Sequence, residues 1–353
     1  MPQSLRLGER YCFPETYWLP RKARALSFVK RLLQALGIII FQRRYDGQDA
    51  MIGDTQEGNI KWMSLPTQSE REYAKKIATS IRPHFAIASY PWMIPLFDVL
   101  GSPVCKRICL HYDIAWQRAE MNAHINGREA EITRTEEAEL LARSDLVVDI
   151  SESDRREVTR MVPGADTLVA PKGFVANPVS DSHSKIVLFV GSGNLFNVEG
   201  LTWLLHHVWP TVFNADFEVA LHVCGSINHA FQAAIHGVRF FGVVENLTRH
   251  YAEAALVVGP LRRATGQNIK IIEAAAFGKA IVATSVAVSS VPELKCAVLC
   301  ADDAIDFAAA IRRLLYNPSE RCELGHSAAQ IVNMHFRTDQ CYGPLLQWLK
   351  HMH

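Results

Sequence analysis

The sequence lacks any apolar run long enough to cross a membrane. Its longest runs, residues 36–41 and 254–260, are far shorter than the about 20 residues that a spanning helix needs. The N-terminal segment also lacks the apolar stretch of a secretory signal. We therefore expect a protein of the reducing cytoplasm.

Paired cysteines and a strong net charge are also missing. The eight cysteines form no CxxC pair and no cluster with histidine, and several lie inside apolar runs. This pattern favours neither a zinc site nor a disulfide framework, so no metal is expected. The formal net charge of +1 argues against a nucleic-acid partner, because domains that bind phosphate backbones are usually far more basic.

What the sequence has is enough apolar material for two cores. Its 353 residues exceed the size at which a single core stops growing, about 250–300 residues. Apolar residues make up 49% and charged residues 21% of the chain, a balance typical of folded globular domains. Two domains of comparable size are therefore expected.

From residue 184 onward, short apolar runs alternate with segments of helical period. Strands are expected at residues 185–190, 217–224, 238–243, 255–259, 280–284 and 297–300. Helices are expected after the first of these strands and near residues 230–236, 247–254 and 267–277. Buried strands alternating with helices predict an α/β domain with a parallel sheet covered on both faces.

The first half has the same character but is less regular. A helix is expected over residues 20–36, and strands at residues 37–41, 59–64, 85–89, 107–110, 146–150 and 167–170. The opening residues lack a strand followed by a glycine-rich turn, so the first βα loop is expected to be abbreviated. Residues 177–184 are rich in turn formers and are the expected linker.

Two segments of the second half could bind a ligand. Residues Gly191, Ser192 and Gly193 lie between an expected strand and helix, where backbone N–H groups can bind a phosphate. A tight turn without a ligand explains this segment equally simply. A dinucleotide fingerprint would need a further glycine where Phe196 stands, which disfavours a nicotinamide-dependent oxidoreductase.

The second segment, residues 259–278, combines a strand end, a polar loop and a helix that carries Lys270 and Glu273 on one face. Ligands of open α/β sheets lie beyond the carboxyl ends of the strands, where this loop must be. A carboxylate there can accept ribose hydroxyls, and cations can meet a diphosphate. The alternative is that Lys270 and Glu273 form an ordinary surface ion pair.

Several stretches together resemble a known family. FVGSGNLFNVEGL and GQNIKIIEAAAFGKAIVATS resemble the C-terminal domain of the family 4 retaining glycosyltransferases, whose fold is GT-B. ICLHYDIAW, EEAELLARSDLVVDISESDRREV and LVAPKGF resemble that family's acceptor domain. The resemblance covers about residues 80–335 and is strongest to transferases of bacterial exopolysaccharide loci. It implies two Rossmann-like domains, at residues 1–180 and 184–335, and a C-terminal helix at 336–353 that packs back on the first.

The resemblance also implies a donor site. Glu273 corresponds to the second glutamate of the family's E-x7-E motif, which holds the donor ribose, whereas the first glutamate of the motif is here Thr265. The cationic pair that many members place after the glycine turn is replaced by Asn197, Val198 and Glu199. Lys270, with Arg262 or Arg263, is then the candidate for the diphosphate. The full expected donor site comprises Gly191, Ser192, Gly193, Arg262, Thr265, Gly266, Gln267, Asn268, Lys270 and Glu273.

The first half contributes two further candidates. His111 and Asp113 match the family's HD pair, which implies that His111 contacts the donor sugar and Asp113 orients the acceptor. A histidine after a strand is otherwise more often structural. With Lys270 and Glu273, these are the expected catalytic residues.

The function implied is transfer of a sugar, with retention and without a metal ion. The donor, UDP- or GDP-linked, is a substrate, and no cofactor is expected. The acceptor is a glycan, a lipid-linked sugar or a small molecule. Basic residues in the segment 21–31 suggest peripheral membrane contact, although a basic run is usually a solvated face. Because the family pattern is incomplete, a non-catalytic GT-B protein that binds a sugar nucleotide or a partner transferase remains the alternative.

Overall fold

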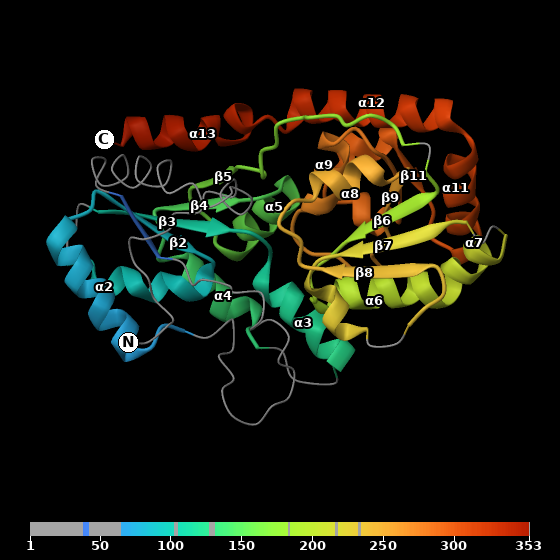
Figure 1. Ribbon diagram of the computed structural model, residues 1–353. Helices are drawn as coiled ribbons and strands as arrows, with labels where there is room; N and C mark the ends of the chain where they lie inside the picture. The colour runs from blue at the N-terminus through green and yellow to red at the C-terminus, as the bar shows by residue number, and fades with distance from the viewer. Residues whose placement is uncertain are drawn as a thin grey trace. The chain divides into compact units, whose positions relative to one another are not determined.

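The computed structural model describes residues 38–41, 65–101, 105–126, 131–182, 184–215, 218–231 and 234–352. The chain divides into two units (Figure 1). The described part of unit 1 comprises residues up to 173 and from 341 onward, and unit 2 comprises residues 174–340. Among the described residues, no helix is both long enough and apolar enough to span a membrane.

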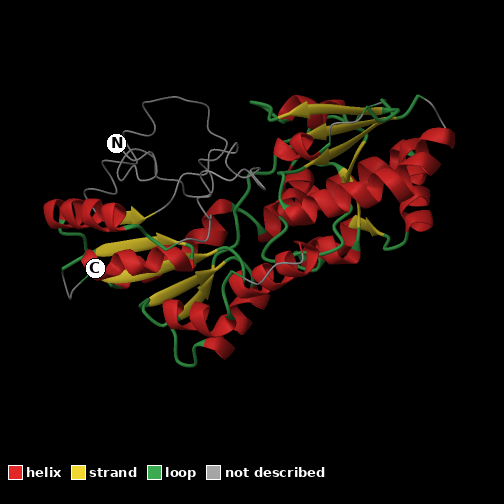
Figure 2. Ribbon diagram, turned by 90° about the horizontal axis from the view of Figure 1, so that it is seen from below, coloured by secondary structure: helices red, strands yellow, loops and turns green. Residues whose placement is uncertain are grey.

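Unit 1 is built on a five-stranded parallel sheet in the order β1-β2-β3-β4-β5. Its strands are β1 (Ile38–Phe41), β2 (Phe85–Ser89), β3 (Lys106–His111), β4 (Leu146–Asp149) and β5 (Thr167–Val169). The helices between them are α2 (Gln68–Ile81), α3 (Ala115–Asn126), α4 (Arg134–Leu141) and α5 (Glu152–Met161), with a 3-10 segment at Pro91–Val99. Figure 2 shows this alternation of helices and strands by colour.

The strands of unit 1 are apolar on both faces, as a sheet covered on both sides requires. Side chains alternate along a strand, so Phe85 and Ile87 join one core while Ala86 and Ala88 join the other. The last helix, α13 (Thr338–His351), contributes Leu345 to the first of these cores. The end of the chain is therefore part of unit 1.

Unit 2 has a six-stranded parallel sheet in the order β11-β10-β9-β6-β7-β8. Its strands are β6 (Ile186–Val190), β7 (Ala220–Cys224), β8 (Val238–Gly242), β9 (Leu256–Gly259), β10 (Ala280–Ala283) and β11 (Val298–Cys300). Its helices are α6 (Leu195–Trp203), α7 (Trp209–Ala215), α8 (Thr248–Glu253), α9 (Ile269–Ala276), α10 (Ser285–Val288), α11 (Ala304–Tyr316) and α12 (Pro318–His335). A π-helical turn at Leu204–Val208 joins α6 to α7.

The helices of unit 2 cover both faces of its sheet. In Figure 1, α6 lies on one side of the strands, and α8, α9 and α12 lie on the other. The buried residues form two clusters to match, because Val187 and Phe189 of β6 face the first set of helices and Leu188 faces the second. The same alternation places His222, between Leu221 and Val223, on the side of α8 and α9.

Most expected strands are present within one or two residues, but one expected helix is wrong. Residues 226–230 form only a 3-10 turn, and Phe231 is extended with φ −127° and ψ 106°. Its ring stacks on Phe240 of β8, with centroids 5.8 Å apart. Packing of this aromatic residue, rather than helical period, decides the backbone here. The helix expected at 20–36, the strand at 59–64 and the opening loop lie outside the described residues.

The boundary between the units lies earlier than the expected linker. Phe174 N–H donates to the Phe336 carbonyl at 2.6 Å, and Asn177 N–H donates to the Ala276 carbonyl at 2.8 Å. Asp181 accepts two hydrogen bonds from the Arg321 guanidinium, at 2.7 and 3.1 Å. Residues 174–182 are therefore fastened to unit 2, and the division falls after Gly173 instead of at 180–184.

Candidate functional site

The glycine turn of unit 2 follows the carboxyl end of β6 and caps α6. The Asn194 side chain accepts a hydrogen bond from Asn197 N–H at 2.9 Å, which satisfies one of the free donors at the helix start. Gly191 N–H donates to the Cys224 carbonyl, and Gly193 N–H donates to Ser226 Oγ at 3.2 Å. These two amides serve the fold itself, and Ser192 and Asn194 are the exposed residues of this turn.

Asn197 joins this turn to the second candidate segment. Its amide nitrogen donates to the Ser192 carbonyl at 2.9 Å and to Ser192 Oγ at 3.1 Å. Its amide oxygen accepts a hydrogen bond from Lys270 Nζ on α9. The buried Asn197 side chain thus connects the two segments. In the sequence, Asn197 stood out only because it departs from the family pattern.

Lys270 is partly buried beside this amide, and burial disfavours the protonated, charged form of its amine. Burial lowers the pKa of Lys270 to about 7, and the nearby Glu273 carboxylate acts in the opposite direction. A lysine in this state gains a proton readily when an anion arrives, because the anion favours the charged form. Lys270 therefore suits a site that binds phosphate.

Glu273 is held in place by a tyrosine that the sequence analysis did not identify. The Tyr251 hydroxyl donates to Glu273 Oε2 at 3.0 Å. The Tyr251 ring is fully buried and stacks on Phe277, with centroids 4.2 Å apart. Burial, followed by the Glu273 charge, raises the pKa of Tyr251 well above its usual value, so the hydroxyl keeps its proton. Tyr251 therefore fixes the position of a partly exposed carboxylate.

A small pocket lies among these groups, where β6 and β9 end and α9 begins. Among the residues that line it are Val190, Asn197, Tyr251, Gly259, Asn268 and Lys270. This is the edge of a parallel α/β sheet at which ligands usually bind.

The two arginines of the loop before α9 point to other partners. Arg262 donates to the Asp302 carbonyl at 2.6 Å, and its guanidinium lies 4.9 Å from the centre of the Trp203 ring. Arg263 forms an ion pair with Glu199 at 2.9 Å. Lys270, Arg262 and Arg263 were the cations expected at the diphosphate. Lys270 lines the pocket, whereas both arginines bind residues outside its lining.

The rest of this loop is shaped by its backbone. Gly266 has a φ of +63°, in the left-handed region that favours glycine. Asn268 is buried, where its N–H donates to Ser290 Oγ and its side chain donates to the Ala287 carbonyl. Asn268 thus anchors the start of α9, while Thr265 and Gln267 are partly exposed on the loop.

In unit 1, His111 lies at the end of β3 and is enclosed by carboxylates. Its Nδ1 lies 2.7 Å from Asp149 Oδ1, and its Nε2 lies 2.8 Å from Glu137 Oε1. Burial alone lowers the pKa of His111, but the hydrogen bonds and charges of Asp149 and Glu137 outweigh it and raise the pKa to about 10. His111 is 1% exposed, so both ring nitrogens are used inside the protein. This arrangement favours a structural role for His111 over contact with a donor sugar.

Glu137 and Asp113 extend this buried cluster. Glu137 also accepts hydrogen bonds from the N–H groups of Ala115 and Trp116, at 2.9 and 2.8 Å, and so caps the start of α3. Asp113 is buried and forms an ion pair with Arg118 at 2.9 Å. The expected pair of His111 and Asp113 is thus present at one sheet edge, with His111 fixed by partners far away in sequence and Asp113 by the nearby Arg118.

The described residues bring together one group that could hold a metal ion. His222, His250 and Glu253 each offer a ligand atom, and these atoms lie within 4.8 Å of one another. The residues are separated along the chain by up to 31 positions, so no short sequence motif marks them.

The family model described as glycosyl transferases group 1 matches residues 184–317. This segment of unit 2 is therefore similar to a glycosyl transferases group 1 domain. The pocket at β6, β9 and α9 lies inside this domain, as do Lys270 and Glu273. No curated protein sequence matches the chain.

Solved structures resemble the fold of this chain at low sequence identity. Sucrose-phosphate synthase from Thermosynechococcus elongatus is 17% identical with a TM-score of 0.65, and the match covers 93% of each chain. HepE from Anabaena, in complex with UDP, is 13% identical with a TM-score of 0.62, covering 79% of this chain and 82% of that one. A variant of S. aureus TarM, in complex with Fondaparinux, α-GlcNAc-glycerol and UDP, is 14% identical with a TM-score of 0.63.

The match to that TarM variant covers 79% of this chain, which spans only 58% of TarM's length. These likenesses establish the fold. The prediction of a GT-B architecture, with two Rossmann-like units, is confirmed.

Proposed function

We propose that this chain is a glycosyltransferase that moves a sugar from a nucleotide-sugar donor to an acceptor. The observation that carries the proposal is the chain of contacts from Ser192 through Asn197 to Lys270, one helical turn from Glu273. It lies at a ligand-binding edge of a domain whose family is named for glycosyl transfer. The structure of HepE with UDP supports UDP-linked sugars as the first donors to test.

In this proposal, each group has one task. The Glu273 carboxylate accepts hydrogen bonds from the ribose, and Tyr251 keeps it in position. Lys270 gains a proton as the diphosphate binds and offsets the charge that develops on the leaving group. Asn197 holds the Lys270 amine close to the glycine turn. We further propose that the sugar is transferred with retention of its anomeric configuration and without a catalytic metal ion. The proposed acceptor is a glycan, a lipid-linked sugar or a small molecule.

A thermal-shift series with UDP, GDP and their sugar conjugates tests the binding step, because a ligand raises apparent stability by mass action. Replacing Glu273 with alanine removes hydrogen bonds to a charged group. We expect Glu273→Ala to weaken nucleotide binding about 10- to 100-fold, the effect of about 1.5–3 kcal/mol. Glu293→Ala is the control, since Glu293 is an exposed carboxylate of the same unit. Equal affinity in both variants would contradict the proposal.

A non-catalytic GT-B protein is the second candidate. The observation in its favour is that Arg262 and Arg263 are engaged by Asp302 and Glu199, which leaves Lys270 as the cation placed at the pocket within the described residues. Hydrolysis of the bound donor distinguishes the two candidates. Turnover that Glu273→Ala abolishes supports the enzyme. A folded protein that binds nucleotide but turns over none of the donors in the series supports the second candidate.

A further inference from the structure

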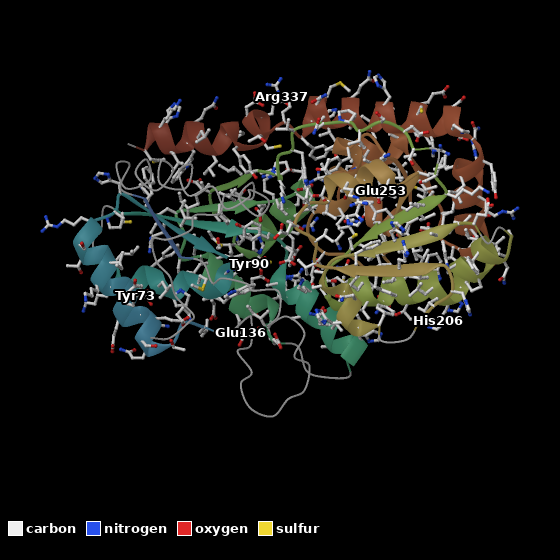
Figure 3. All side chains as sticks on the ribbon, viewed as in Figure 1. Tyr73, Tyr90, Glu136, His206, Glu253 and Arg337 are labelled. Atoms are coloured by element: carbon white, nitrogen blue, oxygen red, sulfur yellow. The ribbon has the colours of Figure 1, made fainter. Side chains whose placement is uncertain are left out.

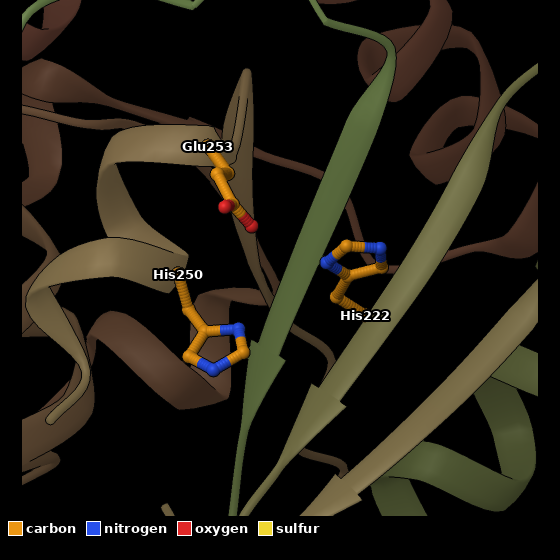
Figure 4. A group of neighbouring side chains, drawn as sticks. All are labelled: His222, His250 and Glu253. Atoms are coloured by element: carbon orange, nitrogen blue, oxygen red, sulfur yellow. The ribbon is translucent and has the colours of Figure 1, made fainter. Parts of the chain in front are cut away.

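Three side chains of unit 2 converge at a place that the proposed function does not use. His222 lies on β7, and His250 and Glu253 lie three residues apart on α8. Figure 4 shows the two imidazole rings, each turning a nitrogen toward the Glu253 carboxylate and toward the other ring. One ligand atom from each residue lies within 4.8 Å of the other two. The cluster combines two nitrogen ligands with one oxygen ligand.

The burial of the two histidines makes this arrangement unusual. His222 is 5% exposed and His250 is 9% exposed. The Nδ1 atom of each ring is buried, and neither finds a hydrogen-bond partner within the described structure. Buried polar atoms are normally paired, so two facing unpaired nitrogens call for an explanation. A ligand that accepts lone pairs from both nitrogens supplies one.

We propose that His222, His250 and Glu253 bind a divalent transition-metal ion of the Zn²⁺ type. Two histidines and one glutamate form a known three-residue ligand set for zinc, with water in the fourth position. Imidazole nitrogen and carboxylate oxygen are both suitable donors for such ions. Calcium and magnesium fit less well, because they prefer sites made entirely of oxygen ligands.

Binding requires only a small local movement. Two atoms that bind the same zinc ion at about 2.1 Å can be no more than about 4.2 Å apart. The three ligand atoms here lie within 4.8 Å of one another, so they need to move only slightly closer. The Glu253 side chain is 38% exposed, and its present partner is the 82% exposed guanidinium of Arg249, at 2.7 Å. Exposed ion pairs of this kind are weak, so Glu253 can turn from Arg249 to a metal ion at little cost.

The position of the cluster indicates a structural role. Glu253 is the last residue of α8 and precedes β9, whereas the nucleotide pocket lies where β6 and β9 end. The Ser184 hydroxyl, just before β6, donates to the Glu253 carbonyl at 2.5 Å, which places that carbonyl near the start of the strands. A metal ion here ties α8 to β7 and does not contact the donor.

The surroundings allow an ion to enter. The Phe241 ring meets both imidazoles edge-on, with centroids 4.8 Å from His222 and 4.7 Å from His250. Phe241 is 39% exposed, whereas the two histidines that its ring contacts are buried. Movement of one partly exposed aromatic side chain therefore opens a path from solvent.

Titration of the chelator-treated full chain with Zn²⁺ and Co²⁺ tests the proposal. We expect one ion per chain, a higher melting temperature with Zn²⁺, and a Co²⁺ spectrum of nitrogen and oxygen ligation without thiolate bands. His250→Gln and Glu253→Gln should each lower the affinity by at least about tenfold. His206→Gln is the matched control, because Figure 3 shows His206 on a different element of unit 2 from Glu253.

Glu253→Gln should fold normally, because Glu253 is partly exposed and glutamine has nearly the same shape. Its loss of metal affinity can therefore not be ascribed to misfolding. Both variants should retain the wild-type affinity for UDP, so a failure here is separate from a failure of the proposed function. Three results would overturn the proposal: no binding of either ion, unchanged binding in the two variants, or thiolate bands that assign the ion to the exposed Cys296, Cys300 or Cys322.

Discussion

Lys270 lies against the amide oxygen of Asn197 and one helical turn before Glu273. Its side chain is largely surrounded by protein, which disfavours the charged form and lowers its pKa to about 7 from the usual 10.5. At neutral pH the amine is thus close to the midpoint of its titration. Small changes in its surroundings decide whether it carries a charge.

This state predicts that nucleotide binding takes up a proton. The diphosphate raises the pKa of Lys270, so between the free and bound pKa values the complex holds more protons than the free protein. The affinity for UDP should therefore fall as the pH rises above 7, by up to about tenfold per pH unit. Calorimetry in buffers of different ionisation enthalpy measures the uptake. Lys270→Met should abolish it, whereas Lys295→Met, at an exposed position, should leave it unchanged.

His111 provides a prediction about stability. Removing this imidazole leaves the buried carboxylates of Glu137 and Asp149 without their shared partner. Breaking such a buried charge pair costs about 3–5 kcal/mol, so His111→Gln should lower the free energy of unfolding by that amount. Urea unfolding measures the loss, and His124→Gln, at an exposed position on α3, is the control.

The same residue makes the loss depend on pH. The pKa of His111 is about 10 in the folded chain, above the usual 6.5 of an unfolded one. Its contribution is fully present below pH 6.5 and is lost as the pH rises through 10. The difference in unfolding free energy between wild type and His111→Gln should therefore shrink from pH 6.5 to pH 10. A difference that stays constant or grows would contradict the charged state of His111.

At the scale of elements, close packing of α12 on the rest of unit 2 depends on a glycine. A Cβ atom at Gly325 would overlap the carbonyl oxygen of Gly278, at the end of α9. At Gly343 on α13, an added Cβ has no atom within 4 Å apart from its chain neighbours, one of which is Pro344. Two helical glycines thus stand in opposite environments.

Alanine at these positions should have effects of different size. Gly325→Ala forces the helix away from the backbone at Gly278 and should destabilise the protein by about 1–3 kcal/mol. Gly343→Ala should change the stability by less than roughly 0.5 kcal/mol, because the smaller entropy loss of alanine in a helix is offset by its contact with the following Pro344. Thermal or urea unfolding of both variants measures the change. Destabilisation of equal size at both sites would show that close approach is not the cause.

The elements that the sequence predicted well are those with a local signal. The strand at 85–89 coincides with β2, and β6 and β9 differ from expectation by one residue at their starts, because buried strands read as continuous apolar runs. The same reasoning failed at 230–236, where the stacking of Phe231 on Phe240 overrides helical period. Tertiary contacts of this kind leave no periodic pattern in the sequence.

The residues of the candidate sites also divide into those with a local sequence signal and those without one. Lys270 and Glu273 could be identified, because their spacing puts them on one helical face beyond a strand end. Their partners Asn197 and Tyr251 could not, because each comes from another element and lies more than 20 positions away. His222, an isolated histidine inside an apolar strand, gives no signal until the fold brings α8 beside β7.

For the molecule as a whole, the chain leaves unit 1 after Gly173, forms unit 2 and returns to unit 1 at Cys341. The returning helix α13 buries Leu345, at 3% exposure, against the core that contains Phe85 and Ile87. Trp348 follows one turn later, with its ring centroid 6.4 Å from that of Phe85. Unit 1 therefore depends on residues that are synthesised after all of unit 2.

This arrangement predicts that a change at the end of the chain weakens unit 1 and spares nucleotide binding by unit 2. Leu345→Ala should lower the stability of unit 1 by about 2–5 kcal/mol, the usual result of truncating a buried leucine. Leu346→Ala is the matched control on the same helix, because Leu346 is 49% exposed. Hydrogen exchange should show faster exchange in β2, β3 and β4 of Leu345→Ala, with β6, β7 and β9 unchanged and the affinity for UDP retained. Equal loss of protection in both sets of strands would instead mean that the two units unfold as one cooperative body.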